Sequence, residues 1–159
     1  MIYYDLIPSP IGQLLLVAAE HGLQQIVFEG ENQSDTIKDS WIKAPDKLRT
    51  VSNQLAAYFR KELEIFDVKL SPQGTAFQKQ IWNELIKIPY GQTCSYLDIA
   101  IAIGKPKACR AIGMANSKNP IPIIIPCHRV IGKNGELTGY AGGLSKKSYL
   151  LTLEQTQNK

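Results

Sequence analysis

A four-residue segment near the middle of the chain, Ser71-Pro72-Gln73-Gly74, has neither helix nor strand character and separates two halves of different composition. Residues 1–71 carry 7 Lys and Arg against 10 Asp and Glu, whereas residues 72–159 carry 11 against 4. A chain of 159 residues is long enough to bury two small cores. We therefore predict two domains, residues 1–71 and residues 72–159. The positive charge of the second domain suits it to meet a polyanion, and the alternative is that this charge serves only solubility.

The first half has the character of a sheet covered by a helix. Aliphatic and aromatic runs broken by proline and glycine are typical of short strands, and the later apolar residues recur at the helical period. We assign this half no chemistry and expect a scaffold. Its elements are predicted, in chain order, as strands at 2–7, 13–19 and 23–28, a polar loop at 30–44, a helix at 46–59 capped by Asp46, and a short strand at 65–68.

The second half is predicted to be mainly helical, so the fold class is α/β, of the α+β kind. Gly104-Lys105 turns the chain into Pro106, a residue suited to the first position of a helix. Two helices joined in this way resemble a helix-turn-helix. The expected elements are helices that begin at the capping boxes Thr75-x-x-Gln78 and Ser95-x-x-Asp98, a helix at 106–117, a glycine-rich loop at 132–143 and a helix at 145–155.

The predicted helix at 106–117 is rich in small residues and carries one arginine, Arg110. Small side chains let the helix backbone approach a second surface, which is either another helix or a nucleic-acid duplex. In the first case Arg110 is a solvated charge. In the second it projects into the duplex, while lysines and backbone amides contact phosphates. The residues alone leave both interpretations open.

One cysteine, Cys127, stands in a context that favours chemistry. It follows a run of mostly β-branched residues at 121–125 and a proline, Pro126, that fixes the backbone before the sulfur. A thiol reacts as its thiolate and needs a base or a positive field nearby, and the next two residues, His128 and Arg129, are candidates for both. The alternative is a buried structural cysteine, which is the commoner kind.

Three cysteines at wide spacing do not suggest a disulfide framework, and they fit a reducing cytosol. We expect Cys94 and Cys109 to be structural. Because the chain has no CxxC pair and only two histidines, we expect no metal site. The first residues lack the basic segment and apolar stretch of a signal peptide, and no apolar run is long enough to span a bilayer. A cytoplasmic location is expected, or a nuclear one in a eukaryote.

A series of motifs lies between residues 72 and 155. They are Ile125-Pro126-Cys127-His128-Arg129-Val130-Ile131, Phe77-Gln78-x-x-Ile81-Trp82, Pro89-Tyr90-Gly91-Gln92-Thr93, Ser95-Tyr96, Arg110-Ala111-Ile112-Gly113-x-Ala115, Asn119-Pro120-Ile121-Pro122, Gly139-Tyr140-Ala141-Gly142-Gly143-Leu144 and Leu150-Leu151-x-Leu153-Glu154. Their identity, order and spacing resemble those of the O6-alkylguanine-DNA alkyltransferase family. The first half of the chain matches that family only in general character.

The resemblance implies DNA repair without a cofactor. An O6-alkylguanine base leaves the duplex for a pocket, and Cys127 takes the alkyl group in one stoichiometric transfer. His128 is expected to act as its base through a water, and Glu154 to orient and polarise His128. Tyr96 is expected to donate a proton at guanine N3, and Asn119 to tie the turn after the helix to the active-site segment. Without the family, Glu154 and Tyr96 would be taken for an exposed carboxylate and a half-buried aromatic.

The resemblance also implies how the base and the DNA are held. The backbone carbonyls of Cys127 and Val130 are expected to accept from the guanine amino group. Tyr140, Ala141 and Gly142 are expected to form a pocket wall, with the Ala141 amide aimed at O6. Arg110 is expected to fill the gap left by the everted nucleotide, with its helix in the minor groove of double-stranded DNA and the protein acting as a monomer. Further DNA contacts are expected from Thr93, Ser95, Ala111, Gly113 and Ala115.

Two other functions stay open at this point. One is a module that binds alkylated DNA without repairing it; a related non-catalytic group has tryptophan in place of the cysteine, whereas this chain keeps Cys127. The other is a cysteine hydrolase, for which the basic half and the Arg110 helix have no purpose. Some relatives carry a structural zinc on the first domain, and this chain lacks the ligands for it.

Overall fold

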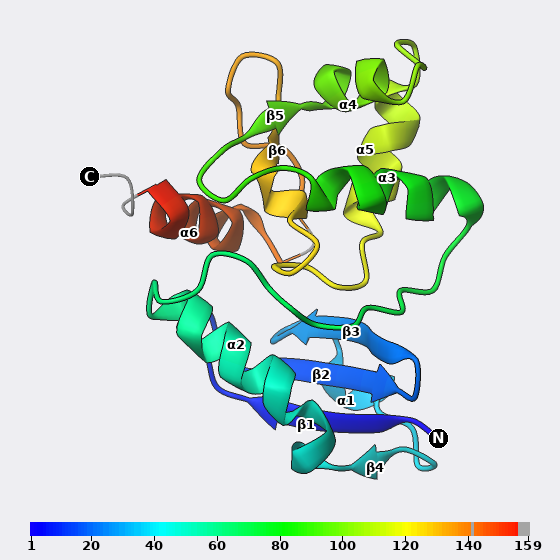
Figure 1. The fold of residues 1–159 in the computed structure, drawn as a ribbon, viewed down its shortest axis with the longest axis vertical. Helices are drawn as coiled ribbons and strands as arrows, with labels where there is room; N and C mark the ends of the chain where they lie inside the picture. Colours follow the sequence, from blue (N-terminus) through cyan, green and yellow to red (C-terminus); the bar gives the residue numbers. More distant parts are fainter. Residues whose placement is uncertain (141, 156–159) are drawn as a thin grey trace. The chain divides into compact units, whose positions relative to one another are not determined.

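A computed structural model describes residues 1–140 and 142–155, and it divides into two compact units, Met1–Gln73 and Gly74–Lys159. The N-terminal unit is built on a four-stranded sheet and the C-terminal unit is mainly helical (Figure 1). The α+β fold class predicted from the sequence is therefore confirmed. Within the described residues, no helix is both long and apolar enough to cross a membrane.

The sheet of the N-terminal unit has the strand order β3-β2-β1-β4 (Figure 1). Strands β1 (Tyr3–Ile7), β2 (Leu14–Ala19) and β3 (Gly22–Phe28) are antiparallel neighbours, and β4 (Ile42–Lys43) pairs in parallel with β1. Strand β2 lies between two neighbours and is buried from Leu14 to Ala18. Its continuous apolar sequence is the pattern expected of a strand covered on both faces.

Helix α2 (Arg49–Phe59) follows a short 3-10 turn, η1 (Pro45–Leu48), and buries Val51, Leu55 and Tyr58. The predicted cap is wrong, because Asp46 lies inside η1 and the position before α2 is Leu48, which makes no side-chain cap. The carboxylate of Asp46 instead pairs with Arg49 one turn later.

Two further predictions for this unit are wrong. The segment at 30–44 is not all loop, since it holds a single helical turn, α1 (Gln33–Thr36), and the edge strand β4. The segment at 65–68 is not a strand: the side chain of Gln54 accepts from the Asp67 amide and donates to its carbonyl, so both groups are satisfied without a strand partner. The chain reaches the sheet just after this segment, where Leu70 forms an isolated bridge with Leu23; the Leu23 amide donates to the Lys69 carbonyl, and the Ser71 amide donates to the Leu23 carbonyl.

The C-terminal unit packs helices around a two-stranded parallel pair (Figure 1). Both predicted capping boxes are present, Thr75 with Gln78 and Ser95 with Asp98. The elements are α3 (Ala76–Ile86), β5 (Cys94–Ser95), α4 (Tyr96–Ala102), α5 (Cys109–Ser117), the 3-10 turn η2 (Cys127–Arg129), β6 (Val130–Ile131) and α6 (Leu144–Gln155).

The turn between α4 and α5 differs from the sequence prediction. Gly104 adopts φ +73°, and the amides of Gly104 and Lys105 return to the carbonyls of Ile101 and Ala100. These two hydrogen bonds close α4 as a Schellman motif, which favours glycine at the left-handed position. Pro106 then lies in a turn, and α5 begins at Cys109.

Candidate active site

Cys127 opens the η2 turn, at the end of a segment that is buried throughout. Its amide donates to the Ile125 carbonyl at 2.7 Å. Asn119 braces the same segment at two points: its side-chain nitrogen donates to the Ile125 carbonyl at 2.8 Å, and its side-chain oxygen accepts from the Ile121 amide at 2.9 Å. The segment that precedes the sulfur-bearing residue is therefore held by the side chain of Asn119.

Ile123, in the middle of this segment, has φ +76°. A β-branched residue avoids this left-handed region, and such a conformation costs about 1–3 kcal/mol. Ile123 is 1% exposed and its neighbours Ile121 and Ile125 are fully buried, so packing holds the strained backbone in place. Strain of this kind, kept next to a reactive side chain, is a recurrent property of functional sites.

Glu154 is a buried carboxylate that contacts two residues of η2, the imidazole of His128 and the guanidinium of Arg129. His128 Nε2 lies 2.7 Å from Glu154 Oε2, and Arg129 donates to both carboxylate oxygens at 2.9 and 3.0 Å. Burial alone would raise the pKa of Glu154, but the hydrogen bonds and charges of His128 and Arg129 outweigh it and lower the pKa to about 2. The carboxylate is therefore ionised and accepts every one of these bonds.

The ionised Glu154 fixes the state of His128. Because a carboxylate only accepts, the His128 Nε2 carries the proton, and burial lowers the pKa of the imidazole although Glu154 opposes this. A neutral ring protonated at Nε2 leaves its Nδ1 as a free acceptor. Among the described residues this Nδ1 has no hydrogen-bond partner, so it is available to take a proton.

The thiol of Cys127 is protonated in the resting protein. It is 5% exposed, and burial raises its pKa to about 11, although a hydrogen bond from Asn119, the charge of Lys147 and a hydrogen bond from Tyr140 act in the opposite direction. A thiol in this state cannot react until a base removes its proton. His128, the neighbouring residue, has the free acceptor that this step needs.

Tyr96 is the first residue of α4. Its hydroxyl is 2.9 Å from the Thr138 hydroxyl in the 132–143 loop. The preceding residues form β5, which pairs in parallel with β6 immediately after the η2 turn, so that Cys94 faces Val130. The strand pair thus ties the backbone before Tyr96 to the backbone after Cys127, although 31 positions of sequence separate the two residues.

Lys147 on α6 is fully buried, and its Nζ donates to the Val130 carbonyl at 2.6 Å and to the Thr138 carbonyl at 2.7 Å. Sequence reasoning missed it. It also missed that Arg129 is the second partner of Glu154. A signal for Lys147 exists, because it shares the apolar face of α6 with Leu150 and Glu154, and a lysine on such a face is rarely without a polar partner. For Arg129 we find no such signal.

The predicted pocket wall is only partly described. Val130 is fully buried, and Tyr140 and Gly142 are half-buried. Tyr140 lowers the pKa of the Cys127 thiol, against the effect of burial, so this residue lies near the sulfur. The Cys127 carbonyl is 3.5 Å from the side-chain nitrogen of Asn116. Ala141, with the amide expected at O6, lies outside the described residues.

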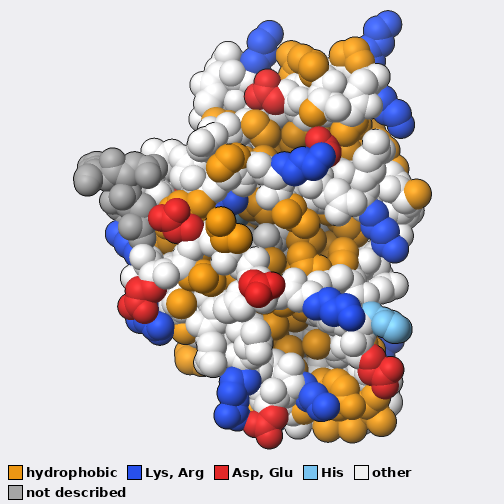
Figure 2. Space-filling view, in the orientation of Figure 1, with side chains coloured by type: hydrophobic (Ala, Val, Ile, Leu, Met, Phe, Trp, Pro, Cys, Tyr) orange, Lys and Arg blue, Asp and Glu red, His pale blue; other side chains and the backbone are white. Residues whose placement is uncertain are grey.

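Helix α5 presents Arg110, Ala111 and Met114 to solvent on one side. Gly113 is half-buried, and a Cβ built there would lie 3.8 Å from the Tyr96 ring. The prediction that Ala115 faces DNA is wrong: Ala115 is buried with Ile112 on the core side, and its carbonyl accepts from the Trp82 indole at 2.9 Å. On the face seen in Figure 2, Lys and Arg side chains surround the end of the C-terminal unit that holds α4 and α5.

The last two predicted DNA contacts are Thr93, the residue before β5, and Ser95, the last residue of β5. Thr93 is exposed and lines a shallow cavity of about 230 Å³ together with Cys94. Ser95 is half-buried, and its hydroxyl accepts from the Asp98 amide as the cap of α4. Its side chain is therefore already used in the fold.

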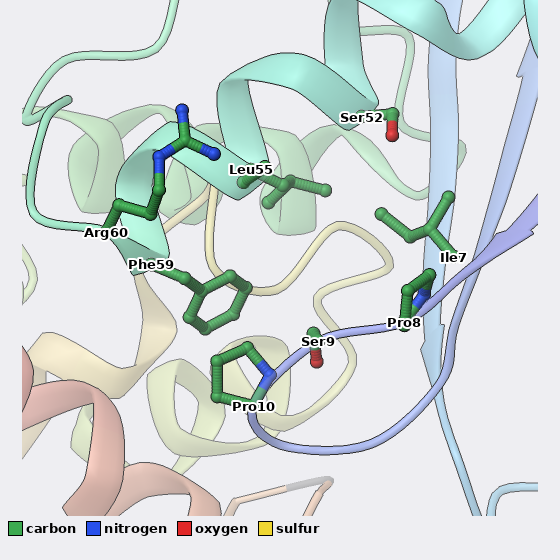
Figure 3. Close-up of a pocket in the computed structure, with 9 residues that line it drawn as sticks. Ile7, Pro8, Ser9, Pro10, Ser52, Leu55, Phe59 and Arg60 are labelled. Carbon is green, nitrogen blue, oxygen red and sulfur yellow. The ribbon is translucent and has the colours of Figure 1, made fainter.

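The N-terminal unit has a cavity of its own, of about 350 Å³, between the Pro8–Pro10 loop and α2 (Figure 3). Apolar side chains such as Ile7, Leu55 and Phe59 line most of it, and Arg60 is the one charged residue among its lining. Its other polar side chains are the hydroxyls of Ser9 and Ser52, and its lining holds no carboxylate, histidine or cysteine that could activate them. None of the predicted site residues lines it.

Comparisons with known proteins match each half of the chain to a separate family model. The family model for the DNA binding domain of 6-O-methylguanine DNA methyltransferase matches residues 76–156, and the model for its ribonuclease-like domain matches residues 2–72. The methylated-DNA--protein-cysteine methyltransferase of Methanosarcina acetivorans is 54% identical over 96% of this chain and 98% of its own length. The constitutive methylated-DNA--protein-cysteine methyltransferase of Bacillus subtilis is 42% identical over 100% and 99%. The structure of Mycobacterium tuberculosis OGT in complex with DNA has a TM-score of 0.89 at 46% identity, over 98% of this chain and 94% of that one.

Proposed function

The chain belongs to the 6-O-methylguanine DNA methyltransferase family, and we propose that it repairs DNA by moving the alkyl group of an O6-alkylguanine directly onto Cys127. The observation that carries this proposal is the buried cluster behind the thiol. Glu154, held by Arg129, fixes His128, the residue that follows the protonated Cys127, and leaves its Nδ1 without a hydrogen-bond partner among the described residues. That arrangement supplies a base for one nucleophilic attack.

The reaction that we propose balances without a cofactor. His128 Nδ1 takes the Cys127 proton through a water, and the thiolate attacks the alkyl carbon, so that an S–C bond forms while the C–O6 bond breaks. The electron pair of the broken bond passes to the purine. Tyr96 donates its hydroxyl proton at guanine N3, and the proton held by His128 restores the tyrosine. The net change is one thioether and one repaired guanine.

A thioether is stable, and nothing in this scheme removes it. Each chain is therefore expected to act once. Asn119 serves the reaction indirectly, because its two hydrogen bonds hold the segment that carries the nucleophile. Val130, Tyr140, Ala141 and Gly142 are proposed to form the wall that receives the base.

The partner that we propose is double-stranded DNA bound along its minor groove, with the damaged base everted. The exposed side of α5 supports this, because Arg110 stands there beside the small residue Ala111. An arginine can replace the everted nucleotide in the stack, while small residues let the helix enter a narrow groove. We propose that Thr93, Ser95 and Gly113 make further contacts with the DNA. The net charge of +7 for residues 72–159 predicts affinity that falls with salt.

We also propose that the protein acts as a monomer in the cytoplasm and needs neither metal nor cofactor. Its three cysteines are unpaired, which suits a reducing compartment. No group of three His, Cys, Asp or Glu side chains suited to a metal ion occurs in residues 1–140 and 142–155.

Incubation with duplex DNA containing O6-[methyl-³H]methylguanine tests the function. We expect one tritiated methyl per chain, and peptide mass spectrometry should place it on Cys127. Label on another residue, or repeated turnover by one chain, would contradict the proposal. Tight binding of the damaged duplex with no loss of methyl would favour a recognition module instead, and turnover of an ester would favour a hydrolase.

A further inference from the structure

We infer that Lys147 is a positioning residue for this reaction, which sets the place of the Tyr96 hydroxyl relative to the nucleophile-bearing strand. The inference rests on the proposed function and adds to it a residue outside the Cys-His-Glu cluster. The feature that carries it is a closed ring of contacts through the C-terminal unit.

The ring starts at the ammonium group of Lys147. It donates to the Val130 carbonyl at 2.6 Å and to the Thr138 carbonyl at 2.7 Å, and the side chain is fully buried. Both distances are short for N–H···O bonds, as is usual for a charged donor. One side chain of α6 therefore joins the strand after the η2 turn to the loop that is proposed to cover the base.

Each of the two hydrogen bonds of Lys147 is connected to Tyr96 through further contacts. Val130 belongs to β6, which pairs with β5, and β5 ends at the residue before Tyr96. Thr138 reaches the other end of the same side chain, because its hydroxyl lies 2.9 Å from the Tyr96 hydroxyl. Lys147 thus fixes both the backbone and the phenolic oxygen of the proposed proton donor.

A buried lysine that served only to stabilise the fold would not need this connection. Its removal would lower the free energy of unfolding, and any effect on transfer would be independent of Tyr96. A positioning residue gives a different result, because its effect on the rate passes through the group that it positions. The two cases are separated by a double-mutant cycle on the transfer rate.

The cycle compares Lys147→Met, Tyr96→Phe and the double variant in single-turnover transfer from duplex DNA containing O6-methylguanine, at saturating protein. We expect Lys147→Met to slow transfer by about 10- to 100-fold, the range that small misplacements of reacting groups produce. The double variant should be no slower than the slower single variant. Thr138→Val, which keeps the carbonyl and removes only the hydroxyl, should likewise show no further loss in combination with Tyr96→Phe. Lys79→Met makes the same replacement at an exposed site on α3 and should transfer at the unaltered rate.

Rate losses that multiply in the double variant would overturn the inference, as would an unchanged rate in Lys147→Met. If Lys147→Met does not fold, the same cycle with Lys147→Arg decides, since arginine keeps the charge but moves the donors. These outcomes are distinct from failure of the proposed function, in which the unaltered chain itself transfers no methyl.

Discussion

Arg129 and Glu154 form a two-point ion pair, in which the Nε and one terminal nitrogen of the guanidinium each donate to a different carboxylate oxygen. One of those oxygens is also the partner of His128 Nε2. The guanidinium has a further anchor at the Ile88 carbonyl, 2.6 Å away. The carboxylate that sets the tautomer of His128 is therefore itself held in plane by the residue after the histidine.

Arg129→Gln should lower the free energy of unfolding by about 3–5 kcal/mol, because it leaves the Glu154 charge buried without its main partner. Urea unfolding followed by circular dichroism measures this. Arg60→Gln is the matched control, since Arg60 makes an exposed pair with Glu62, and such pairs contribute about 0–1 kcal/mol. Equal losses of unfolding free energy in the two variants would show that the buried Arg129–Glu154 pair contributes no more to stability than an exposed pair.

Cys127→Ala should abolish methyl transfer and leave affinity for damaged duplex DNA unchanged, because the sulfur is the acceptor and not a DNA contact. Transfer is measured by loss of label from the oligonucleotide and affinity by fluorescence anisotropy. Cys109→Ala removes a different free thiol and should transfer normally. Residual methyl transfer by the Cys127→Ala variant would show that another residue accepts the methyl group.

Arg110→Ala should slow transfer at saturating protein while leaving stability within about 0.5 kcal/mol, because the side chain is exposed. Loss of about 1.4 kcal/mol from the everted state slows transfer about tenfold. Lys118→Ala, near the other end of α5, should weaken binding in a salt-dependent way without changing the saturated rate. A normal saturated rate in Arg110→Ala would remove the arginine from base eversion.

The free energy of unfolding should fall on acidification in two steps. Burial lowers the pKa of His128 below 6.5, so below that pH the unfolded chain binds a proton that the folded chain excludes. Glu154 has a folded pKa of about 2 against an ordinary 4.5, so the unfolded chain again binds more protons as the pH falls from about 4.5 to about 2. Both effects have the same sign.

Urea midpoints measured between pH 8 and pH 3 test this, with Glu154→Gln as the comparison. The Glu154→Gln variant should be less stable at pH 7, and its urea midpoint should change less with pH below 4.5 than that of the unaltered chain. A midpoint that rises between pH 6.5 and pH 5 in the unaltered chain would contradict a neutral, buried His128.

Local sequence signals account for much of the fold. Strands β1–β3 and the two capping boxes depend on neighbouring residues, and they could be predicted. The start of α5 could not, because the Schellman turn at Gly104 carries the chain past Pro106 before the helix begins. Ala115 was misplaced although the buried positions Ile112, Ala115 and Asn116 follow the helical period.

The site shows the limits of a single sequence more clearly. Cys127 and His128 are neighbours and stand out together, whereas Glu154 was joined to them only through a family resemblance. Long-range packing determines the rest: β5 pairs with β6 across a long stretch of chain, and Lys147 reaches two carbonyls on separate segments. Neither contact has a fixed spacing that a pattern could reveal.

The state of the Cys127 thiol has a consequence if the protein is consumed by a single transfer, as we propose. Peroxides and soluble electrophiles attack sulfur in proportion to its ionised fraction, and that fraction is very small for a thiol with a pKa of about 11. If each chain acts once, as proposed, a thiol in this state slows the oxidation and chance alkylation of molecules that have not yet met a lesion.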